Sequence, residues 1–245
     1  MQEPKSTLVK IGDFVFKYRN MLFPVILVGL CLWSAPVNTF NGSEAAGRAM
    51  DFIAFGIVIA GLAVRAAVIG YKYIKRGGLD KQVYADTLVT QGFFAVCRNP
   101  LYVGNMLMYL GIFLMHGDMM VFVVGMALFT FIYTAIIAAE EYFLRGKFGE
   151  QYEAYCRDVR CWVPRLNRLP AATRGMKFHW RRVIAKDYTT IINGMFAVLG
   201  MEWWEEIASR EPINWALFFG SALFLLAAQG GIRVVKKRGL LGDVA

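Results

Sequence analysis

Six apolar stretches, each close to the length that crosses a lipid bilayer, limit the fold of this chain more than any other feature. A helix rises about 1.5 Å per residue, so roughly 20 apolar residues cover about 30 Å of hydrocarbon. The stretches are residues 21–37, 50–71, 101–116, 119–139, 188–204 and 213–232. The sequence therefore predicts an all-α fold, a polytopic membrane protein of about six transmembrane helices that forms a single membrane domain over residues 1–245.

The composition excludes an ordinary water-soluble domain. Of the 245 residues, 57% are hydrophobic and only 18% are charged, whereas soluble proteins have roughly 25% charged and 45–50% apolar residues. A cleaved signal peptide over residues 1–37 is the rival interpretation of the first stretch. The basic segment that precedes this stretch is too long for a signal peptide and contains Glu3 and Asp13. We therefore expect a membrane helix there.

Basic residues are concentrated in segments that alternate with the apolar stretches. Of the 27 Lys and Arg residues, 24 lie in four segments: residues 1–20, 72–98, 145–186 and 233–238. Because cytoplasmic loops carry the excess of Lys and Arg, we predict an integral membrane protein with both termini and both long basic segments in the cytoplasm. The net charge of +9 then contributes to orientation and to attraction of anionic headgroups, and no nucleic-acid partner is expected.

No metal site is predicted. His116 and His179 lie far apart, and Cys156 and Cys161 lack the CxxC spacing of a zinc site. We expect reduced, structural cysteines. Arg65 is a separate case, because it lies about 10 Å beneath the boundary at Lys72. It either lines a substrate or headgroup cavity or extends to the membrane surface.

The segment 86–105 is too rich in special residues to be a simple connector. Gly92 and Pro100 break any continuous helix, and Pro100 can begin the third apolar helix at its first turn. Arg98, Asn99 and Tyr102 then surround a helix start at the membrane surface, where an anionic group such as a carboxylate is favoured. The alternative is an interfacial anchor, since Arg and Tyr are common at membrane boundaries.

A second unusual segment, residues 140–165, follows the fourth apolar stretch. If Gly146 and Gly149 do not break the helix, six of its residues share one helical stripe: Glu141, Leu144, Phe148, Tyr152, Tyr155 and Val159. Glu140 and Glu141 are about 100° apart on a helix, so they cannot point the same way. The alternative is an amphipathic helix on the headgroups, which explains the basic residues better than the acidic pair.

Together these two segments resemble a known superfamily. The pattern Leu88-Val89-Thr90-x-Gly92-x-Phe94-x-x-x-Arg98-Asn99-Pro100-x-Tyr102-x-Gly104 precedes a hairpin, and Glu140-Glu141-x-x-Leu144-x-x-x-Phe148-Gly149-x-x-Tyr152-x-x-Tyr155 follows it. Both are similar to the isoprenylcysteine carboxyl methyltransferases and phospholipid N-methyltransferases, integral-membrane enzymes that use S-adenosylmethionine. The resemblance covers residues 86–165 as a methyltransferase core and leaves 166–245 as a basic linker and two C-terminal spans.

The resemblance implies a cytoplasmic cofactor pocket and a lipidic substrate that enters from the bilayer. Cofactor contacts carry over to Arg98, Asn99, Pro100, Tyr102, Gly104, Glu140 and Glu141. The chain departs from the family at Asn99, where carboxyl methyltransferases usually have His, at Phe94 in place of Tyr, and at Asp158 in place of a basic residue.

The methyl acceptor stays open between a headgroup amine and a carboxylate of a lipidated thiol compound. An amine must lose a proton before it attacks, for which Glu141 is the candidate base. A carboxylate needs a cation to place it, for which Arg157 and Arg160 are the candidates. Two other functions remain as alternatives, a non-enzymatic transporter or scaffold, and a membrane reductase that uses a nicotinamide cofactor.

Overall fold

A computed structural model describes residues 4–40, 42–72, 83–209 and 214–241, and these residues form helices and connecting segments. The long helices are α1 (Thr7–Cys31), α2 (Glu44–Tyr71), α3 (Pro100–His116), α4 (Met119–Phe148), α7 (Trp180–Ser209) and α8 (Trp215–Lys237). The short elements are η1 (Gly92–Ala95), α5 (Glu150–Asp158), η2 (Leu166–Arg168) and α6 (Leu169–Ala172). Within the described ranges no strand occurs, and the all-α prediction is confirmed.

Each predicted apolar stretch corresponds to one of the six long helices. By length and composition α1, α2, α4 and α8 can cross a membrane, and α3 is apolar but has 17 residues. The sixth, α7, also carries charged residues near both of its ends. The structure therefore supports a polytopic membrane protein, with six as an approximate number of spans.

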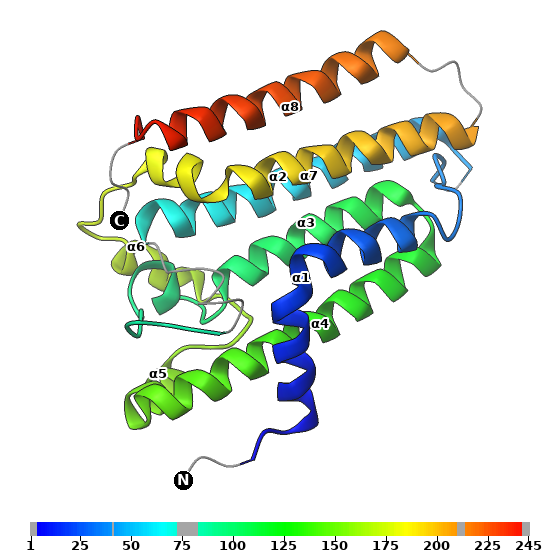
Figure 1. The fold of residues 1–245 in the computed structure, drawn as a ribbon. Coiled ribbons are helices and arrows are strands. Elements are labelled where there is room, and N and C mark those ends of the chain that lie inside the picture. Colours follow the sequence, from blue (N-terminus) through cyan, green and yellow to red (C-terminus); the bar gives the residue numbers. More distant parts are fainter. Residues whose placement is uncertain (1–3, 41, 73–82, 210–213, 242–245) are drawn as a thin grey trace.

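The first helix begins earlier and ends earlier than the predicted stretch 21–37. Ser6 caps its start by accepting a hydrogen bond from the Val9 amide at 3.4 Å. It ends at Cys31, and Pro36 keeps Ala35 out of the helical region, so the helix cannot continue to residue 37. Pro24 lies inside the helix, where it removes a backbone hydrogen bond, and α1 bends along its length (Figure 1).

Helix packing leaves α8 at one edge of the molecule. α1 packs on α4, α4 on α3, α3 on α2, α2 on α7, and α7 on α8 (Figure 1). The alternation of the helices brings α5, α6, and the segment 83–99 to the same end (Figure 1). This end also holds the start of α1 and the end of α8, so the described parts of the predicted cytoplasmic segments lie together (Figure 1). Which side of the membrane they face stays a prediction.

Arg65 is buried rather than extended to the membrane surface. Its guanidinium group forms an ion pair with Asp187 of α7, with Nη2 2.5 Å and Nε 3.1 Å from the two carboxylate oxygens. Nη1 donates to Asn105 of α3 at 2.5 Å. A buried charge is tolerated when it is paired and hydrogen-bonded. The pair therefore joins α2 to α7, a helix that begins at Trp180 rather than at the predicted residue 188.

Helices α2 and α3 cross at two glycines. A Cβ added at Gly61 would lie 2.6 Å from the carbonyl oxygen of Gly104, and one at Gly104 would lie 2.6 Å from Arg65 Cγ. Neither backbone can move away without separating the two helices. Small residues at a crossing let membrane helices approach closely, and here they bring Arg65 and Asn105 within reach of each other.

This crossing predicts a sharp contrast between two alanine substitutions in α2. Gly61→Ala would lower the free energy of unfolding by about 1–3 kcal/mol, because the added methyl group overpacks a backbone contact. Gly56→Ala is the matched control, since nothing lies within 4 Å of its added Cβ. Thermal unfolding of the purified protein in detergent should show a lower midpoint for Gly61→Ala only, and equal midpoints would contradict the close crossing.

Candidate functional site

Arg98 lies at the centre of a polar cluster that joins the two unusual segments. Its Nη2 donates to Glu141 Oε1 at 2.7 Å, across 43 residues of sequence. Its Nη1 donates to the carbonyl oxygens of Val159 at 2.9 Å and Cys156 at 3.3 Å. The side chains of Arg98 and Glu141 are each only 13% exposed. One guanidinium group thus connects the segment before α3 with the end of α4 and the end of α5.

Pro100 sets the local geometry of this cluster. It is the first residue of α3, as predicted, and the carbonyl oxygen of Asn99 accepts hydrogen bonds from the amides of Tyr102 and Val103 at 3.0 and 3.1 Å. The Asn99 side chain does not cap the helix. It donates to the carbonyl oxygen of Cys161 at 3.2 Å. Asn99 therefore holds the segment after α5 against the start of α3.

The two adjacent glutamates point to different neighbours, as their helical spacing predicts. Glu140 accepts a hydrogen bond from the Tyr102 hydroxyl at 2.7 Å. Glu141 pairs with Arg98 and, at 3.1 Å, with Arg145 one turn later in the same helix. The acidic pair is therefore divided between an α3 tyrosine and the arginine cluster.

The continuous stripe expected through residues 141–159 is interrupted. α4 ends at Phe148, and Gly149 has φ of 50° and ψ of −127°, a conformation suited to glycine. Of the two glycines weighed in the sequence, Gly149 breaks the helix and Gly146 does not. The break starts α5, whose Tyr152 is buried. Tyr155 in α5 donates through its hydroxyl to the carbonyl oxygen of Phe94 at 2.7 Å.

Other residues predicted for the site lie at its margin. The Arg157 and Arg160 side chains are exposed and form no ion pair within the described residues, while the Arg160 carbonyl oxygen accepts from the Arg98 amide at 2.9 Å. Gly104 lies at the α2–α3 crossing. The roles assigned to these residues in binding or catalysis stay predictions.

The sequence did not single out the pairing of Asp158, which forms two contacts with Arg168, at 2.9 and 3.0 Å. Arg165 also donates to the Asp158 carbonyl oxygen at 3.1 Å. These contacts join η2 to the end of α5. Spacing alone gave no signal for this pair, because the turn between its members is irregular.

Burial and charge shift the pKa values of the groups in the cluster. Burial disfavours the charged form of Arg98, but the hydrogen bond and charge of Glu141 outweigh it and raise the pKa of Arg98. Burial raises the pKa of the Cys97 thiol to about 11. Burial also raises the pKa of Cys156 and of Cys161, where Glu141 adds to the effect. Arg98 therefore stays cationic, and the three thiols stay protonated near neutral pH.

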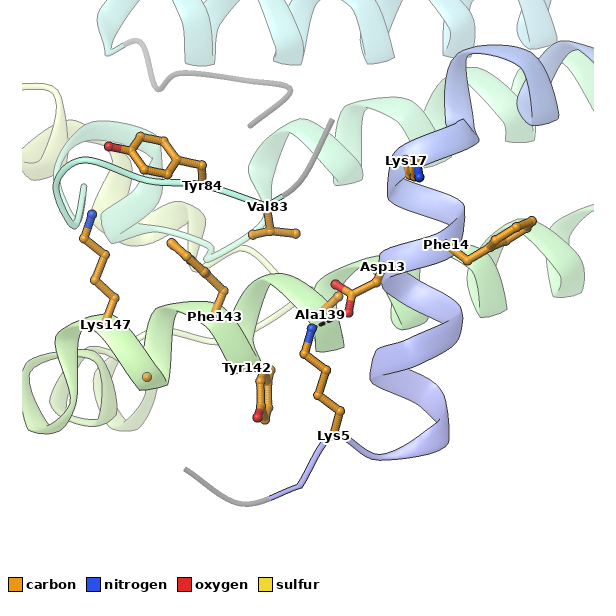
Figure 2. Close-up of a pocket in the computed structure, with 11 residues that line it drawn as sticks. Lys5, Asp13, Phe14, Lys17, Val83, Tyr84, Ala139, Tyr142, Phe143 and Lys147 are labelled. Atoms are coloured by element: carbon orange, nitrogen blue, oxygen red, sulfur yellow. Dashed lines mark hydrogen bonds and ion pairs between the residues drawn. The ribbon is translucent and has the colours of Figure 1, made fainter. Parts of the chain in front are cut away.

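A groove of about 830 Å³ lies beside this cluster, between the start of α1 and the end of α4 (Figure 2). It is lined by Lys5, Asp13, Phe14, Lys17, Val83, Tyr84, Ala139, Tyr142, Phe143, Gly146 and Lys147. None of the residues predicted for cofactor binding or catalysis is among them. The groove uses one face of α4, whereas Glu141 projects from another.

The family comparison concerns the central part of the chain. Residues 50–151 match the family model described as phospholipid methyltransferase. This stretch, less than half of the chain, is similar to that family. The match begins within α2 and ends at the start of α5, so it contains Arg98, Asn99, Glu140 and Glu141. It confirms the predicted resemblance to the superfamily of isoprenylcysteine carboxyl and phospholipid methyltransferases.

Two curated relatives align with about a third of the chain. The cobalt-zinc-cadmium resistance protein CzcN of Cupriavidus metallidurans is 39% identical over 82 residues, 34% of this chain and 38% of that protein. The nickel-cobalt-cadmium resistance protein NccN of Alcaligenes xylosoxydans xylosoxydans is 32% identical over 80 residues, 33% of this chain and 37% of that protein. The alignments thus span less than two fifths of either relative. No solved structure matches the chain significantly.

The packing of the cluster predicts an order of thiol reactivity. Cys97 is 1% exposed and its sulfur lies 3.3 Å from the Cys161 carbonyl oxygen, whereas Cys156 and Cys161 are half-buried. With iodoacetamide at about pH 8.5, Cys156 and Cys161 should be alkylated before Cys97. The alkylation of all three should become faster as the pH rises, because the thiolate is the reactive form. Peptide mass spectrometry measures the rates. Equal rates for the folded protein would contradict the buried position of Cys97.

Proposed function

We propose that this protein is an integral-membrane methyltransferase that uses S-adenosylmethionine and acts on a lipidic substrate. One observation carries the proposal: the two motifs of the methyltransferase family meet through the Arg98–Glu141 pair. The family match covers the first motif and the second as far as Gly149, and four of the surrounding helices are apolar enough for a bilayer. The pair lies where the long basic segments gather, the end that we propose faces the cytoplasm.

The chemistry of the cluster fits this cofactor. Its positively charged sulfonium and amino groups suit carboxylates and aromatic faces, which Glu140, Glu141 and Tyr102 supply. Its carboxylate suits a guanidinium group. The buried Nε of Arg98 has no hydrogen-bond partner within the described residues, so one donor of this side chain is available. We infer that Arg98, Asn99, Pro100, Tyr102, Gly104 and the two glutamates form the cofactor site.

Bound S-adenosylmethionine would supply an activated methyl group, which leaves the sulfonium for the acceptor as the sulfur becomes a neutral thioether. The chain's own contribution is to hold the acceptor in line and to exclude water. Glu141 would take the proton from a headgroup amine. The exposed Arg157 and Arg160 would hold the carboxylate of an acidic acceptor. The proposal covers both acceptor classes.

The residue that most favoured a transporter is Arg65, and its contacts in the structure do not require a transport function. Arg65, the charge expected deep in the second span, is engaged by Asp187, Asn105 and Thr190 and is only 5% exposed. These contacts are with α3 and α7, so they join helices, and a buried charge that is paired and hydrogen-bonded needs no transport role to account for it. No observation favours the nicotinamide-dependent reductase over the methyltransferase.

Cofactor binding gives the first test of this proposal. Purified protein in detergent should bind S-adenosylmethionine and S-adenosylhomocysteine in calorimetric titrations. Glu141→Gln should weaken binding by at least about tenfold, because charge-assisted contacts contribute roughly 1.5–3 kcal/mol each. Glu150→Gln, at an exposed glutamate in the first turn of α5, is the matched control and should bind like the wild type.

A structural readout accompanies the titration. Bound cofactor should slow the alkylation of Cys156 and Cys161, which lie within the Arg98 and Glu141 cluster, and leave Cys31 in α1 unaffected. Absence of binding by the wild type would refute the methyltransferase proposal. Cofactor binding that does not protect these two thiols would contradict the assignment of the cofactor site to the Arg98 cluster.

A further inference from the structure

Arg19 lies on the side of α1 that packs against the helix bundle. Four residues of α1 recur at steps of three and four and therefore share this side: Gly12, Phe16, Arg19 and Phe23. A Cβ added at Gly12 would collide with the backbone of Ala135 in α4. Phe16 is only 5% exposed, and the centre of the Phe23 ring lies 5.5 Å from that of Tyr133 in α4. Arg19, between the two phenylalanines, is therefore directed toward the bundle.

The guanidinium group of Arg19 has no carboxylate partner within the described residues. The side chain is half-buried, its Cζ lies 3.9 Å from the centre of the Phe16 ring, and Nη1 donates to the Phe16 carbonyl oxygen at 3.3 Å. An arginine has five N–H donors and stays charged at neutral pH. Arg19 forms that single hydrogen bond among the residues that the structure describes, so most of its donors remain available to a ligand.

Arg19 is also an electrostatic neighbour of two proposed cofactor residues. Its charge acts on Glu140 and on Tyr102, which are joined to each other by the 2.7 Å hydrogen bond. Arg19 and Glu140 nevertheless form no ion pair in the described part of the chain, so Glu140 does not neutralise Arg19 by direct contact. α1 thus supplies a positive charge to the side of the site that Glu140 and Tyr102 form.

Arg19 and Glu140 both lie at the predicted boundary of the bilayer. Arg19 is two residues before the apolar stretch 21–37, and Glu140 directly follows the stretch 119–139. Beyond Arg19, Met21 is 63% exposed, so α1 presents an apolar side chain to the surrounding lipid. A lipid whose hydrocarbon part stays in the bilayer holds its polar group at this depth. Arg19 therefore lies where the polar group of a lipidic acceptor would reach the site.

We propose that Arg19 binds an oxyanion of the lipidic methyl acceptor, a phosphate or a carboxylate, and so contributes to the choice of acceptor. This role rests on the proposed methyl-transfer function and adds to it a residue from outside the matched segment 50–151. A guanidinium group can hold an oxyanion through two parallel hydrogen bonds, which fix its orientation. Arg157 and Arg160 are exposed near the end of α5, whereas Arg19 is the cation on the membrane side of the site.

The test is the rate of methyl transfer as a function of acceptor concentration. Detergent-purified full chain would be given saturating methyl-labelled S-adenosylmethionine and a total lipid extract in mixed micelles. Arg19→Gln should raise the KM for the extract by at least about tenfold, because a charge-assisted contact is lost. The kcat should stay within about twofold of the wild-type value, since a contact made equally in the bound and transition states affects KM alone.

The labelled product identifies the oxyanion. An alkali-labile methyl ester identifies a carboxylate, whereas alkali-stable label in a phosphorus-containing lipid identifies a phosphate beside a methylated amine. Label in a lipid that carries neither anion would overturn the proposal.

Three further variants make the result specific. Lys17→Gln is the matched control, because Lys17 carries the same charge at nearly the same depth but is exposed on another side of α1. Its KM should equal that of the wild type. Arg19→Lys keeps the charge and should recover most of the lost acceptor affinity. Arg19→Met can still pack on Phe16 and should show the same rise in KM as Arg19→Gln, so it replaces that variant if the glutamine prevents folding.

Calorimetric titration with S-adenosylmethionine separates this role from the cofactor site. The Kd of the cofactor should be unchanged in every Arg19 variant. A wild-type KM in Arg19→Gln and Arg19→Met, an equal rise in Lys17→Gln, or a matching loss of cofactor affinity would overturn the role of Arg19 and leave the proposed function standing. A wild-type protein that labels no lipid would refute the proposed function, and the role of Arg19 with it.

Discussion

The hydrogen bonds of the Arg98 guanidinium group hold together the segments around the proposed cofactor site. It reaches Glu141 at the end of α4 and the carbonyl oxygens of Cys156 and Val159 near the end of α5. In the sequence, α3 and most of α4 lie between Arg98 and Glu141. The break at Gly149 separates α4 from α5. Because Arg98 and Glu141 are mostly buried, removal of either one would leave the other as an unpaired buried charge and would destabilise the fold. The loop before α3, the α4 end and α5 are therefore fixed together, and the cofactor residues are fixed with them.

Features with a local physical cause could be predicted from the sequence. Apolar length predicts the six long helices, Pro100 predicts the start of α3, and helical spacing predicts the divergence of Glu140 and Glu141. Contacts between distant segments could not be predicted in this way. The sequence leaves Arg65 open between lining a cavity and extending to the membrane surface. Its partner Asp187 lies 122 residues later, at the edge of a predicted apolar stretch, and nothing local links the two. The break at Gly149 depends on φ, which the sequence permits at either Gly146 or Gly149.

The family segment accounts for only part of the molecule. The match ends at residue 151, before the Cys156 and Val159 carbonyl oxygens that hold Arg98 and before the Asp158–Arg168 pair that fixes the following turn. α7 lies outside the match and is joined to it through Arg65. The groove between α1 and α4 is lined by residues of α1, which precede the match at residue 50, and by residues of α4, which lie within it. Parts of the chain beyond the matched segment thus shape the proposed cofactor site and its surroundings.

Transfer of a labelled methyl group tests the central claim most directly. Purified protein would be incubated with methyl-labelled S-adenosylmethionine and a total lipid extract, and the organic-phase label compared with that of Glu141→Gln. The account predicts label in the lipid fraction for the wild type and a large loss for the variant. Label released by mild alkali would identify an ester, and stable label a methylated amine. A wild-type protein that binds the cofactor but leaves the lipid fraction unlabelled would contradict the account.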